Sequence, residues 1–322
     1  MKELKEVALD CLVSYVKEHN FCLKHASEAF FVLPLLFKEK HSLAQKYLDY
    51  VLSHQTKEGD FDFGQLEFDD GKCGVSEFLF ASEQLLCKLE LCSPELLKGI
   101  QKASSFLLQH VDELYLLYYE YSAKGKLTFK AKKNAYLLSC LSSLSDKLNE
   151  LGQTKEADAL YMVLAKLQLG FERYFYHKSK GVLLSRFYPQ MRKYKLANSL
   201  YSLKLLTLYP LDLSLRNKLL SQELAEIMKK EKTRDILVIL SALKASRPEQ
   251  FAKECEKQKN ILSHFPVSLN IRKKSYAIYK SLFRNAPLQT ITVKRGKSEL
   301  DLIDYNDPST ALEVLLLLED DE

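Results

Sequence analysis

The sequence predicts an all-α protein, an α/α toroid of about six helical hairpins with small β-hairpins on one rim. Apolar residues recur at the i, i+3, i+4 and i+7 spacing of a helix along nearly the whole chain. Only 10 Gly and 8 Pro occur among 322 residues, which favours long helices over many-turned β structure. Several connections between the helices are long and contain a Lys/Gly turn.

The helices follow in chain order from this periodicity and from residues that begin or end a helix. Ser93-Pro94 begins one helix, Gly152 ends another, and Asp307-Pro308-Ser309 begins the last. The predicted helices span 2–19, 24–37, 42–54, 74–91, 94–113, 132–151, 154–173, 195–209, 212–230, 233–245, 248–262, 272–284 and 308–319.

Four connections are centred on a Lys/Gly turn, and three of them have the aromatic or β-branched flanks that are typical of β-hairpins. The four segments read TKEGDFDFG, YEYSAKGKLTF, FYHKSKGVLLSRFY and ITVKRGKSELDLI. In the first, we expect Phe61 and Phe63 to point inward beneath the turn at Gly59. We therefore expect the hairpins to lie on one rim of the helical fold.

Helices of two kinds alternate along the chain. FLFASEQLLCKLEL and AYLLSCLSSL are nearly all apolar and suit inner helices, whereas KEADALYMVLAKLQ is amphipathic and suits an outer one. Such pairs can close into a toroid, in which the helices over 2–37 would pack against the helix over 308–319. An open α-solenoid is the competing layout, because LGQTKEADALYMVLA resembles a tetratricopeptide helix. No Pro- or Gly-rich linker divides the chain, so one domain over 1–322 is expected.

Composition excludes several classes of function. The net charge of +5 is mild and Lys alternates with Glu and Asp, which indicates a solvated surface and no nucleic-acid partner. The N-terminus has no uninterrupted apolar run, so neither a signal peptide nor a membrane anchor is predicted. Seven cysteines without a CxxC motif indicate reduced thiols and a cytoplasmic protein. Neither a metal nor a cofactor is predicted, because no ligand spacing and no nucleotide-binding motif occurs.

The acidic stretch KEGDFDFGQLEFDDGKCG, residues 57–74, resembles part of a known family. That family joins a thioredoxin-like domain to a six-hairpin, glycosidase-like toroid. Its toroid carries a G-G-F, D-x-D-W, P-H-F-E-K-M-L-Y-D and Q-L-L signature. The matches are Gly59 and Phe61 for G-x-F, Glu67 and Asp69 for D-x-D, Leu79-Phe80 for L-Y, and Gln84-Leu85-Leu86 for Q-L-L. NAYLLSCL, residues 134–141, is similar to its W-N-A-L-M-I-S-A-L segment.

The departures from this family concern its chemistry. No part of the 322 residues corresponds to the thioredoxin-like domain, and the chain contains no Trp. The His-Phe-Glu-Lys block of the family is replaced by Gly74-Val75-Ser76-Glu77, and Lys133 replaces the Trp before Asn134. The resemblance to toroidal sugar epimerases implies acid–base work for that His and Glu. The resemblance therefore implies a toroid that has lost its catalytic residues.

Two sets of residues are the candidates for a site. Asp69, Asp70 and Glu77 are the candidate catalytic carboxylates, and the alternative is a solvated turn in which Asp69 or Asp70 caps the next helix. Basic runs precede several predicted inner helices, and cationic side chains at helix N-termini attract anions. The candidate ligand-binding residues are Lys24, His25, Lys133, Asn134, Arg192 and Arg272.

Three hypotheses about function follow. The first is a glycosidase- or epimerase-like toroid without catalysis, which binds a small sugar, an anionic metabolite or a protein partner. The second is an active carbohydrate-processing enzyme that uses Asp69, Asp70 or Glu77. The third is a helical scaffold for protein interaction. The missing His and Glu favour a protein that is not an enzyme.

Overall fold

The computed structural model describes most of the chain. The described residues are 2–23, 26–64, 72–121, 125–191, 193–230, 233–254, 291–295, 298–302, 308, 311–312 and 315–316. Within these ranges, no helix combines the length and the apolar character that a membrane span requires.

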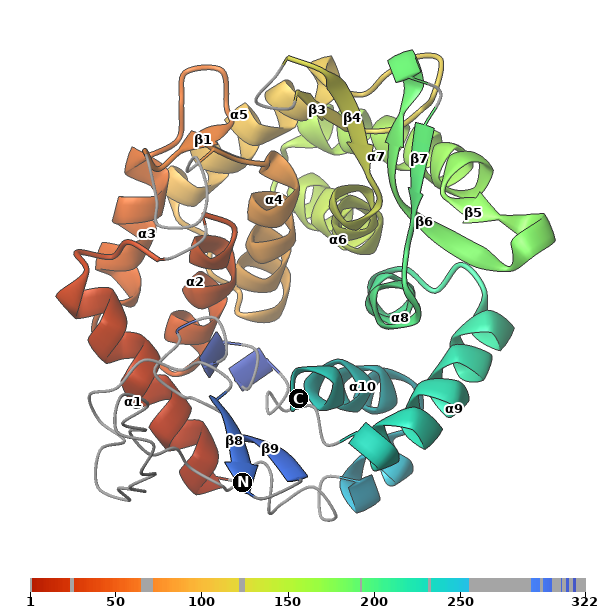
Figure 1. Ribbon diagram of the computed structural model, residues 1–322. Helices are drawn as coiled ribbons and strands as arrows, with labels where there is room; N and C mark the ends of the chain where they lie inside the picture. Colours follow the sequence, from red (N-terminus) through yellow and green to blue (C-terminus); the bar gives the residue numbers. More distant parts are fainter. Residues whose placement is uncertain are drawn as a thin grey trace. The chain divides into compact units, whose positions relative to one another are not determined.

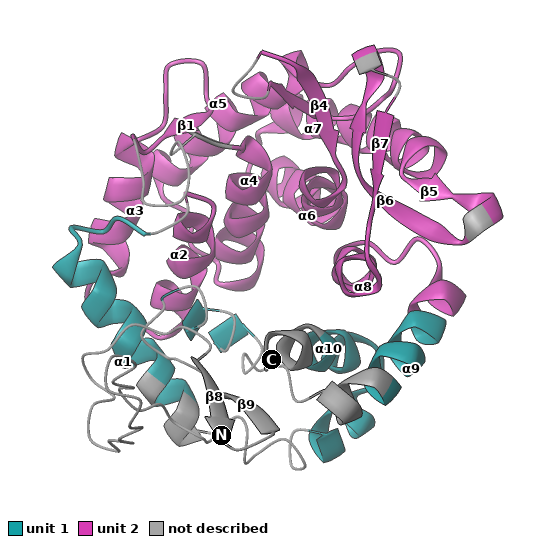
Figure 2. Cartoon of the chain, viewed as in Figure 1, with its two compact units in different colours: residues 1–24, 217–322 teal, residues 25–216 magenta. Residues whose placement is uncertain are grey.

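The chain divides into two compact units, which are coloured separately in Figure 2. Unit 1 comprises residues 1–24 and 217–322, and unit 2 comprises residues 25–216. The N-terminal helix thus belongs to the same compact unit as the C-terminal third of the chain. Ala311, Leu312 and Leu315, from the predicted last helix, are buried. The prediction of one domain over 1–322 is not tested by this division and stays a prediction.

The helices of unit 2 lie close to their predicted positions (Figure 1). They are α2 Glu28–Lys38, α3 Ala44–Ser53, α4 Val75–Glu83, α5 Pro94–Gln109, α6 Ala131–Glu150, α7 Thr154–Tyr174 and α8 Ser199–Leu208. A π-helical turn, Gln84–Lys88, continues α4. The predicted start of α8 at residue 195 is wrong, because residues 193–196 form a strand. Asn198 caps α8 by accepting a 2.7 Å hydrogen bond from the Tyr201 N–H.

The periodicity also predicts three further helices. Helices α1 Lys2–Glu18 and α10 Thr233–Ser246 belong to unit 1, and α9 Leu213–Lys230 joins the two units in sequence. Residues 248–254 are helical, as predicted, while the rest of the predicted helix over 248–262 lies outside the described residues. The predicted helix over 272–284 lies outside them entirely.

The helices of unit 2 form two layers. In the inner layer α2, α4, α6 and α8 pack side by side, and in the outer layer α3, α5 and α7 do the same. Eight of the nine residues of α4 are buried. Only seven of the 21 residues of α7 are buried, at the spacing of one helix face. The predicted distinction between apolar inner helices and amphipathic outer helices is confirmed.

The three predicted β-hairpins are confirmed, and two of them share a sheet. Glycines with positive φ turn two of the hairpins, with φ of 67° at Gly125 and 58° at Gly181. The hairpin strands are β3 Tyr119–Tyr121 with β4 Leu127–Lys130, β5 Tyr176–His177 with β6 Val182–Tyr188, and β8 Ile291–Arg295 with β9 Ser298–Leu302. Strand β4 also pairs with β6, and β6 pairs with β7, Lys193–Leu196, so that unit 2 has one five-stranded sheet.

Buried aromatic side chains hold the segment around Gly59 in place. Phe61 is fully buried and Phe63 is 8% exposed, which confirms that both point inward. The Phe61 ring packs against those of Phe30 and Phe78, at centroid distances of 4.9 and 4.7 Å. The short strand β1, Phe61–Asp62, pairs with β2, Lys72–Cys73, immediately before α4. This pairing places the N-terminus of α4 beside the segment around Gly59.

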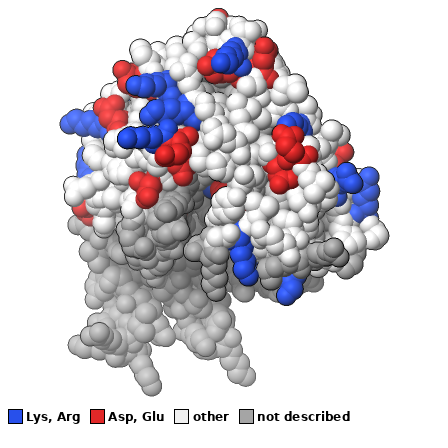
Figure 3. Space-filling view, turned by 90° about the horizontal axis from the view of Figure 1, so that it is seen from above, with Lys and Arg blue, Asp and Glu red and all other residues white. Residues whose placement is uncertain are grey.

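Charged side chains of both signs are mixed on the face of the protein that Figure 3 shows. In the face shown in Figure 3, Lys and Arg side chains lie next to Asp and Glu side chains over the described residues. This mixture agrees with the solvated surface that the sequence predicts.

Candidate functional site

Three of the predicted site residues lie together in the structure. Glu77 is in the first turn of α4, and Lys133 and Asn134 are in the first turn of α6. The other predicted site residues, Lys24, His25, Asp69, Asp70, Arg192 and Arg272, lie outside the described residues.

Glu77 and Lys133 form a close ion pair between the N-termini of two inner helices. The Lys133 ammonium lies 2.7 Å from Oε1 of Glu77 and donates a 2.7 Å hydrogen bond to Oε2. The Ser76 hydroxyl donates a second 2.7 Å hydrogen bond to Oε2. The Glu77 side chain is only 2% exposed and that of Lys133 13% exposed. Both carboxylate oxygens of Glu77 are thus engaged inside the protein.

A second carboxylate, Glu120 of β3, joins this pair from the sheet. Its Oε1 lies 3.3 Å from the Lys133 ammonium and its Oε2 lies 2.6 Å from the Lys130 ammonium. Burial alone would raise the pKa of Glu120, but Lys133 and Lys130 outweigh burial and lower that pKa. We call Glu77, Glu120, Lys130 and Lys133 the ionic cluster. Its two carboxylates and two ammonium groups balance in charge.

Because Gly74 has no side chain, the ionic cluster can occupy the space next to it. A Cβ atom at this position would lie 2.5 Å from Glu120 Oε1 and 2.7 Å from Lys133 Nζ. It would also lie 3.2 Å from Glu77 Oε2. The volume next to Gly74 is therefore filled by charged groups from α4, β3 and α6. Position 74 is also where the resemblance in sequence implies a His.

Asn134 holds the segment before the sheet against α6. It is fully buried, and its side-chain oxygen accepts a 2.9 Å hydrogen bond from the Tyr118 N–H. Its side-chain nitrogen donates 3.0 Å hydrogen bonds to the carbonyl oxygens of Tyr118 and Lys130. These bonds position Glu120 and Lys130, which follow in the adjoining strands. Asn134 therefore holds the backbone segments that carry Glu120 and Lys130 of the ionic cluster.

Lys132 lies next to the ionic cluster and contacts a different set of groups. Its ammonium is 5.4 Å from the centroid of the Tyr136 ring. Tyr136 raises the pKa of Lys132, against the opposing effect of burial, and Glu77 raises it further. Burial also raises the pKa of Tyr201, in the first turn of α8, while Lys132 and Arg186 oppose that shift. A cation thus lies among the N-terminal turns of α6 and α8.

Three aromatic residues from successive inner helices meet, and one of them is Tyr136, the ring next to Lys132. We call Phe31 of α2, Phe80 of α4 and Tyr136 of α6 the aromatic cluster. The Phe31 and Phe80 rings lie 6.0 Å apart, and Tyr136 lies 5.4 and 5.0 Å from them. Phe31 and Phe80 are partly exposed, whereas Tyr136 is buried. Ring faces and a nearby cation suit a ligand that has an apolar face and polar edges.

Sequence reasoning missed the aromatic cluster and Glu120. Aromatic residues at helical spacing are usually core, so Phe31 and Tyr136 gave no signal of their own. Each ring, however, lies within the first two turns of an inner helix, and that recurrence could have been noticed. Glu120 lies in a hairpin whose contact with α6 depends on long-range packing. No local pattern indicates that contact.

The described side chains do not form a metal site. Within the described ranges, no group of three or more His, Cys, Asp or Glu residues could hold a metal ion. The ionic cluster itself has two carboxylates that are already neutralised by ammonium groups. Its geometry is suited to fixing the ends of α4 and α6 relative to the sheet.

Comparisons with known proteins identify the fold and no sequence family. No protein-family model matches the chain, and no curated protein matches it in sequence. An α-amylase from Clostridium perfringens is similar in structure, with 14% identity and a TM-score of 0.54 over 92% of this chain and 87% of that one. A GH76 α-mannanase from Bacteroides thetaiotaomicron has 12% identity and a TM-score of 0.54 over 91% of this chain and 84% of that one.

The chain has the fold of these structures. They are six-hairpin, glycosidase-like toroids, and the prediction of an all-α, α/α toroid is confirmed as a fold class. The competing prediction of an open α-solenoid is wrong. At 14% identity or less, this similarity establishes the fold alone.

Proposed function

We propose that this protein is a carbohydrate-binding toroid that has lost the catalytic residues of its relatives. It descends from the toroid part of the family with a thioredoxin-like domain and binds a sugar or sugar acid. The ligand contacts Phe31 and Phe80, and Lys132 interacts with its polar or anionic groups. The ionic cluster holds the surrounding helix ends in place and takes no part in proton transfer.

The observation that carries this proposal is the filling of the space next to Gly74. An acid–base residue at this position would need room for its side chain, and Glu120 and Lys133 already occupy that room. Glu77 lies one position beyond the Glu of the family signature, which rotates it by about 100° around a helix. Its carboxylate accepts hydrogen bonds from Lys133 and Ser76. The arrangement supports a structural role for Glu77.

The choice of ligand class rests on the aromatic cluster and on the fold. Sugar rings have apolar faces that pack against aromatic side chains, and their hydroxyl groups bond to nearby polar groups. The similar structures are an α-amylase and an α-mannanase, which act on carbohydrates. Because one fold hosts many functions, these neighbours support the ligand class only together with the aromatic cluster.

A binding experiment tests the proposal directly. We expect glucose, mannose, glucuronate or galacturonate to bind the purified protein in isothermal titration calorimetry. Phe80→Leu should weaken binding, because it keeps an apolar side chain but removes the ring face. Lys132→Gln should weaken the binding of a uronate by about tenfold and that of a neutral sugar less, because only the uronate forms a charge-assisted bond. Lys166→Gln, which changes a partly exposed lysine on α7, is the matched control.

An activity assay separates this proposal from an active enzyme. We expect neither hydrolysis nor epimerisation of common mono- and oligosaccharides by the wild-type protein. If turnover is found, Asp69→Asn should reduce it and Glu77→Gln should leave it largely intact. Robust turnover that disappears in a Glu77→Gln variant whose thermal unfolding shows a retained fold would indicate a rebuilt active site and would overturn the proposal.

A further inference from the structure

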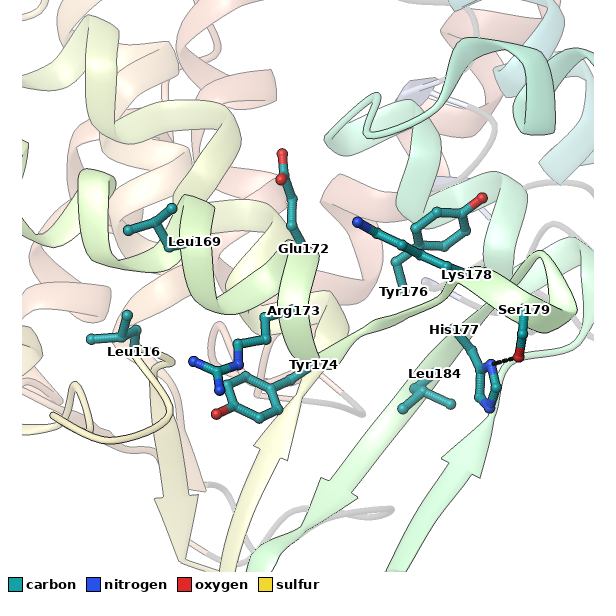
Figure 4. Close-up of a pocket in the computed structure, with 10 residues that line it drawn as sticks. All are labelled: Leu116, Leu169, Glu172, Arg173, Tyr174, Tyr176, His177, Lys178, Ser179 and Leu184. Carbon is teal, nitrogen blue, oxygen red and sulfur yellow. Dashed lines mark hydrogen bonds between the residues drawn. The ribbon is translucent and has the colours of Figure 1, made fainter.

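A pocket of about 720 Å³ lies at the end of the outer helix α7 (Figure 4), and none of the residues that line it belongs to the ionic or the aromatic cluster. Its wall consists of the last two turns of α7, strand β5 and the turn that follows it, together with Leu116 and Leu184. Its volume falls in the range of pockets that hold small organic ligands.

Tyr176 supplies a fixed ring in the wall of this pocket. Its hydroxyl donates a 3.3 Å hydrogen bond to Asp212. Asp212 in turn accepts hydrogen bonds of 2.9 and 3.0 Å from the Ser214 and Leu215 N–H groups at the start of α9. Those backbone bonds lower the pKa of Asp212, so the acceptor is held in its ionised form. The Tyr176 ring is therefore oriented before any ligand binds.

Arg173 and Glu172 supply a donor and an acceptor from neighbouring positions of α7. The Arg173 guanidinium carbon lies 5.3 Å from the centroid of the Tyr174 ring, which is itself stacked on Phe187. Figure 4 shows the guanidinium beside that ring. Arg173, Glu172 and Lys178 are all exposed. Within the described part of the chain, neither Glu172 nor Lys178 forms an ion pair.

The turn after β5 adds further hydrogen-bonding groups. The Lys178 side chain extends toward α7, as Figure 4 shows. The Ser179 hydroxyl and His177 Nδ1 are 3.1 Å apart. The pocket thus combines a carboxylate, a guanidinium, an ammonium, a hydroxyl and a fixed aromatic ring. Donors and acceptors of both signs suit a neutral ligand with many hydroxyl groups better than an ion.

We infer that this pocket is a second carbohydrate site, which binds a neutral oligosaccharide of a few residues. One sugar packs its apolar face on Tyr176, Glu172 accepts hydrogen bonds from its hydroxyl groups, and Arg173 and Lys178 donate to its oxygens. The inference does not depend on the proposed ligand of the inner helices, because the two sites share no residue.

Titration with neutral trisaccharides tests the inference. The probes are maltotriose, cellotriose, α-mannotriose and chitotriose, with glucose 6-phosphate as a charged comparison. We expect at least one trisaccharide to bind, with an affinity that changes little between low and high salt. Tyr176→Phe should keep most of the binding, because the ring remains although its hydrogen bond to Asp212 is lost, whereas Tyr176→Leu should weaken binding by about tenfold. Thermal unfolding of each variant checks that the fold is retained.

The Glu172→Gln variant distinguishes a neutral ligand from an anionic one. For a neutral trisaccharide the variant should weaken binding, because the charge-assisted acceptor is lost. Tighter binding of glucose 6-phosphate in this variant, together with strong salt dependence, would identify an anion site and overturn the inference. Absence of binding by all four trisaccharides at 10 mM, or equal binding in Tyr176→Leu, would overturn it too. Lys166→Gln, which changes a lysine of α7 outside both proposed sites, should leave this binding unchanged.

Discussion

The buried Asn134 side chain bonds to the backbone of Tyr118 in both directions, accepting from its N–H and donating to its carbonyl oxygen. The Asn134 side chain on α6 thus makes the two backbone hydrogen bonds that a neighbouring strand would otherwise make with Tyr118. Tyr118 immediately precedes β3, so the bond fixes where the sheet begins. The position of Glu120, two residues later, follows from it.

The first prediction concerns this pair. Asn134→Ala should lower the free energy of unfolding by about 3 kcal/mol, because it leaves a buried donor and a buried acceptor unpaired. Asn149→Ala, which changes an exposed residue of the same helix, should have little effect. Urea denaturation of both variants measures the difference. Equal stabilities would show that the Tyr118 backbone finds another partner.

The second prediction concerns the loop before α4. Phe61→Ala should lower the free energy of unfolding by about 3–5 kcal/mol, because Phe61 is fully buried and packs against two other rings. Leu114→Ala is the control, since Leu114 is 70% exposed and its truncation should cost less than about 0.5 kcal/mol. A loss below about 1 kcal/mol for Phe61→Ala would mean that the loop is only loosely attached.

The third prediction compares two glycines with positive φ, Gly59 at 111° and Gly152 at 77°. An added Cβ at Gly59 would lie 2.2 Å from the backbone oxygen of Lys102, whereas nothing lies within 4 Å of one at Gly152. Gly152→Ala should cost about 1 kcal/mol from backbone strain alone. Gly59→Ala should cost a further 1–3 kcal/mol, roughly, from overpacking. Similar melting temperatures for the two variants would contradict the close approach.

The fourth prediction is a dependence of stability on pH. Because the folded protein lowers the pKa of Glu120 below its ordinary value near 4.5, the unfolded chain binds more protons in the acidic range. The stability from Glu120 is therefore fully present above pH 4.5 and is lost as the pH falls through the lowered folded pKa.

The Glu120→Gln variant checks this dependence. Its free energy of unfolding should fall less between pH 5 and pH 3 than that of the wild type, in urea titrations at fixed ionic strength. Glu113→Gln should follow the wild type, because the Glu113 side chain is 80% exposed beside Lys166. A Glu120→Gln curve parallel to that of the wild type would rule out the stabilising role of Lys133 and Lys130.

Local patterns in the sequence were sufficient for the helices and the turns. Apolar spacing placed α6 and α7 to within one residue at each end, because burial of one face repeats at the period of the helix. The start of α8 was misplaced, since β7 is a strand only through its pairing with β6. The shared sheet was missed for the same reason. Pairing between distant segments leaves no periodic signal in either segment.

The candidate site was predicted only in part. The resemblance directed attention to position 74 and to the first turn of α6, where Glu77 and Lys133 do meet. Glu120 and Phe31 were not predicted, because they approach through tertiary packing of β3 and α2. Long-range contacts of this kind depend on the whole fold, and a single sequence does not specify them.

The pairing of β4 with β6 links the motions of two hairpins that are far apart in sequence. Phe129 pairs with Phe187, and Lys130 pairs with Arg186. Neither hairpin can separate from the protein by itself without breaking hydrogen bonds of the other, so their amide protons should exchange with solvent in one cooperative opening. Lys130 also belongs to the ionic cluster, so the same opening would release the N-terminus of α6. The rate of this opening would therefore determine how long the N-terminus of α6 stays in its place beside the ionic cluster.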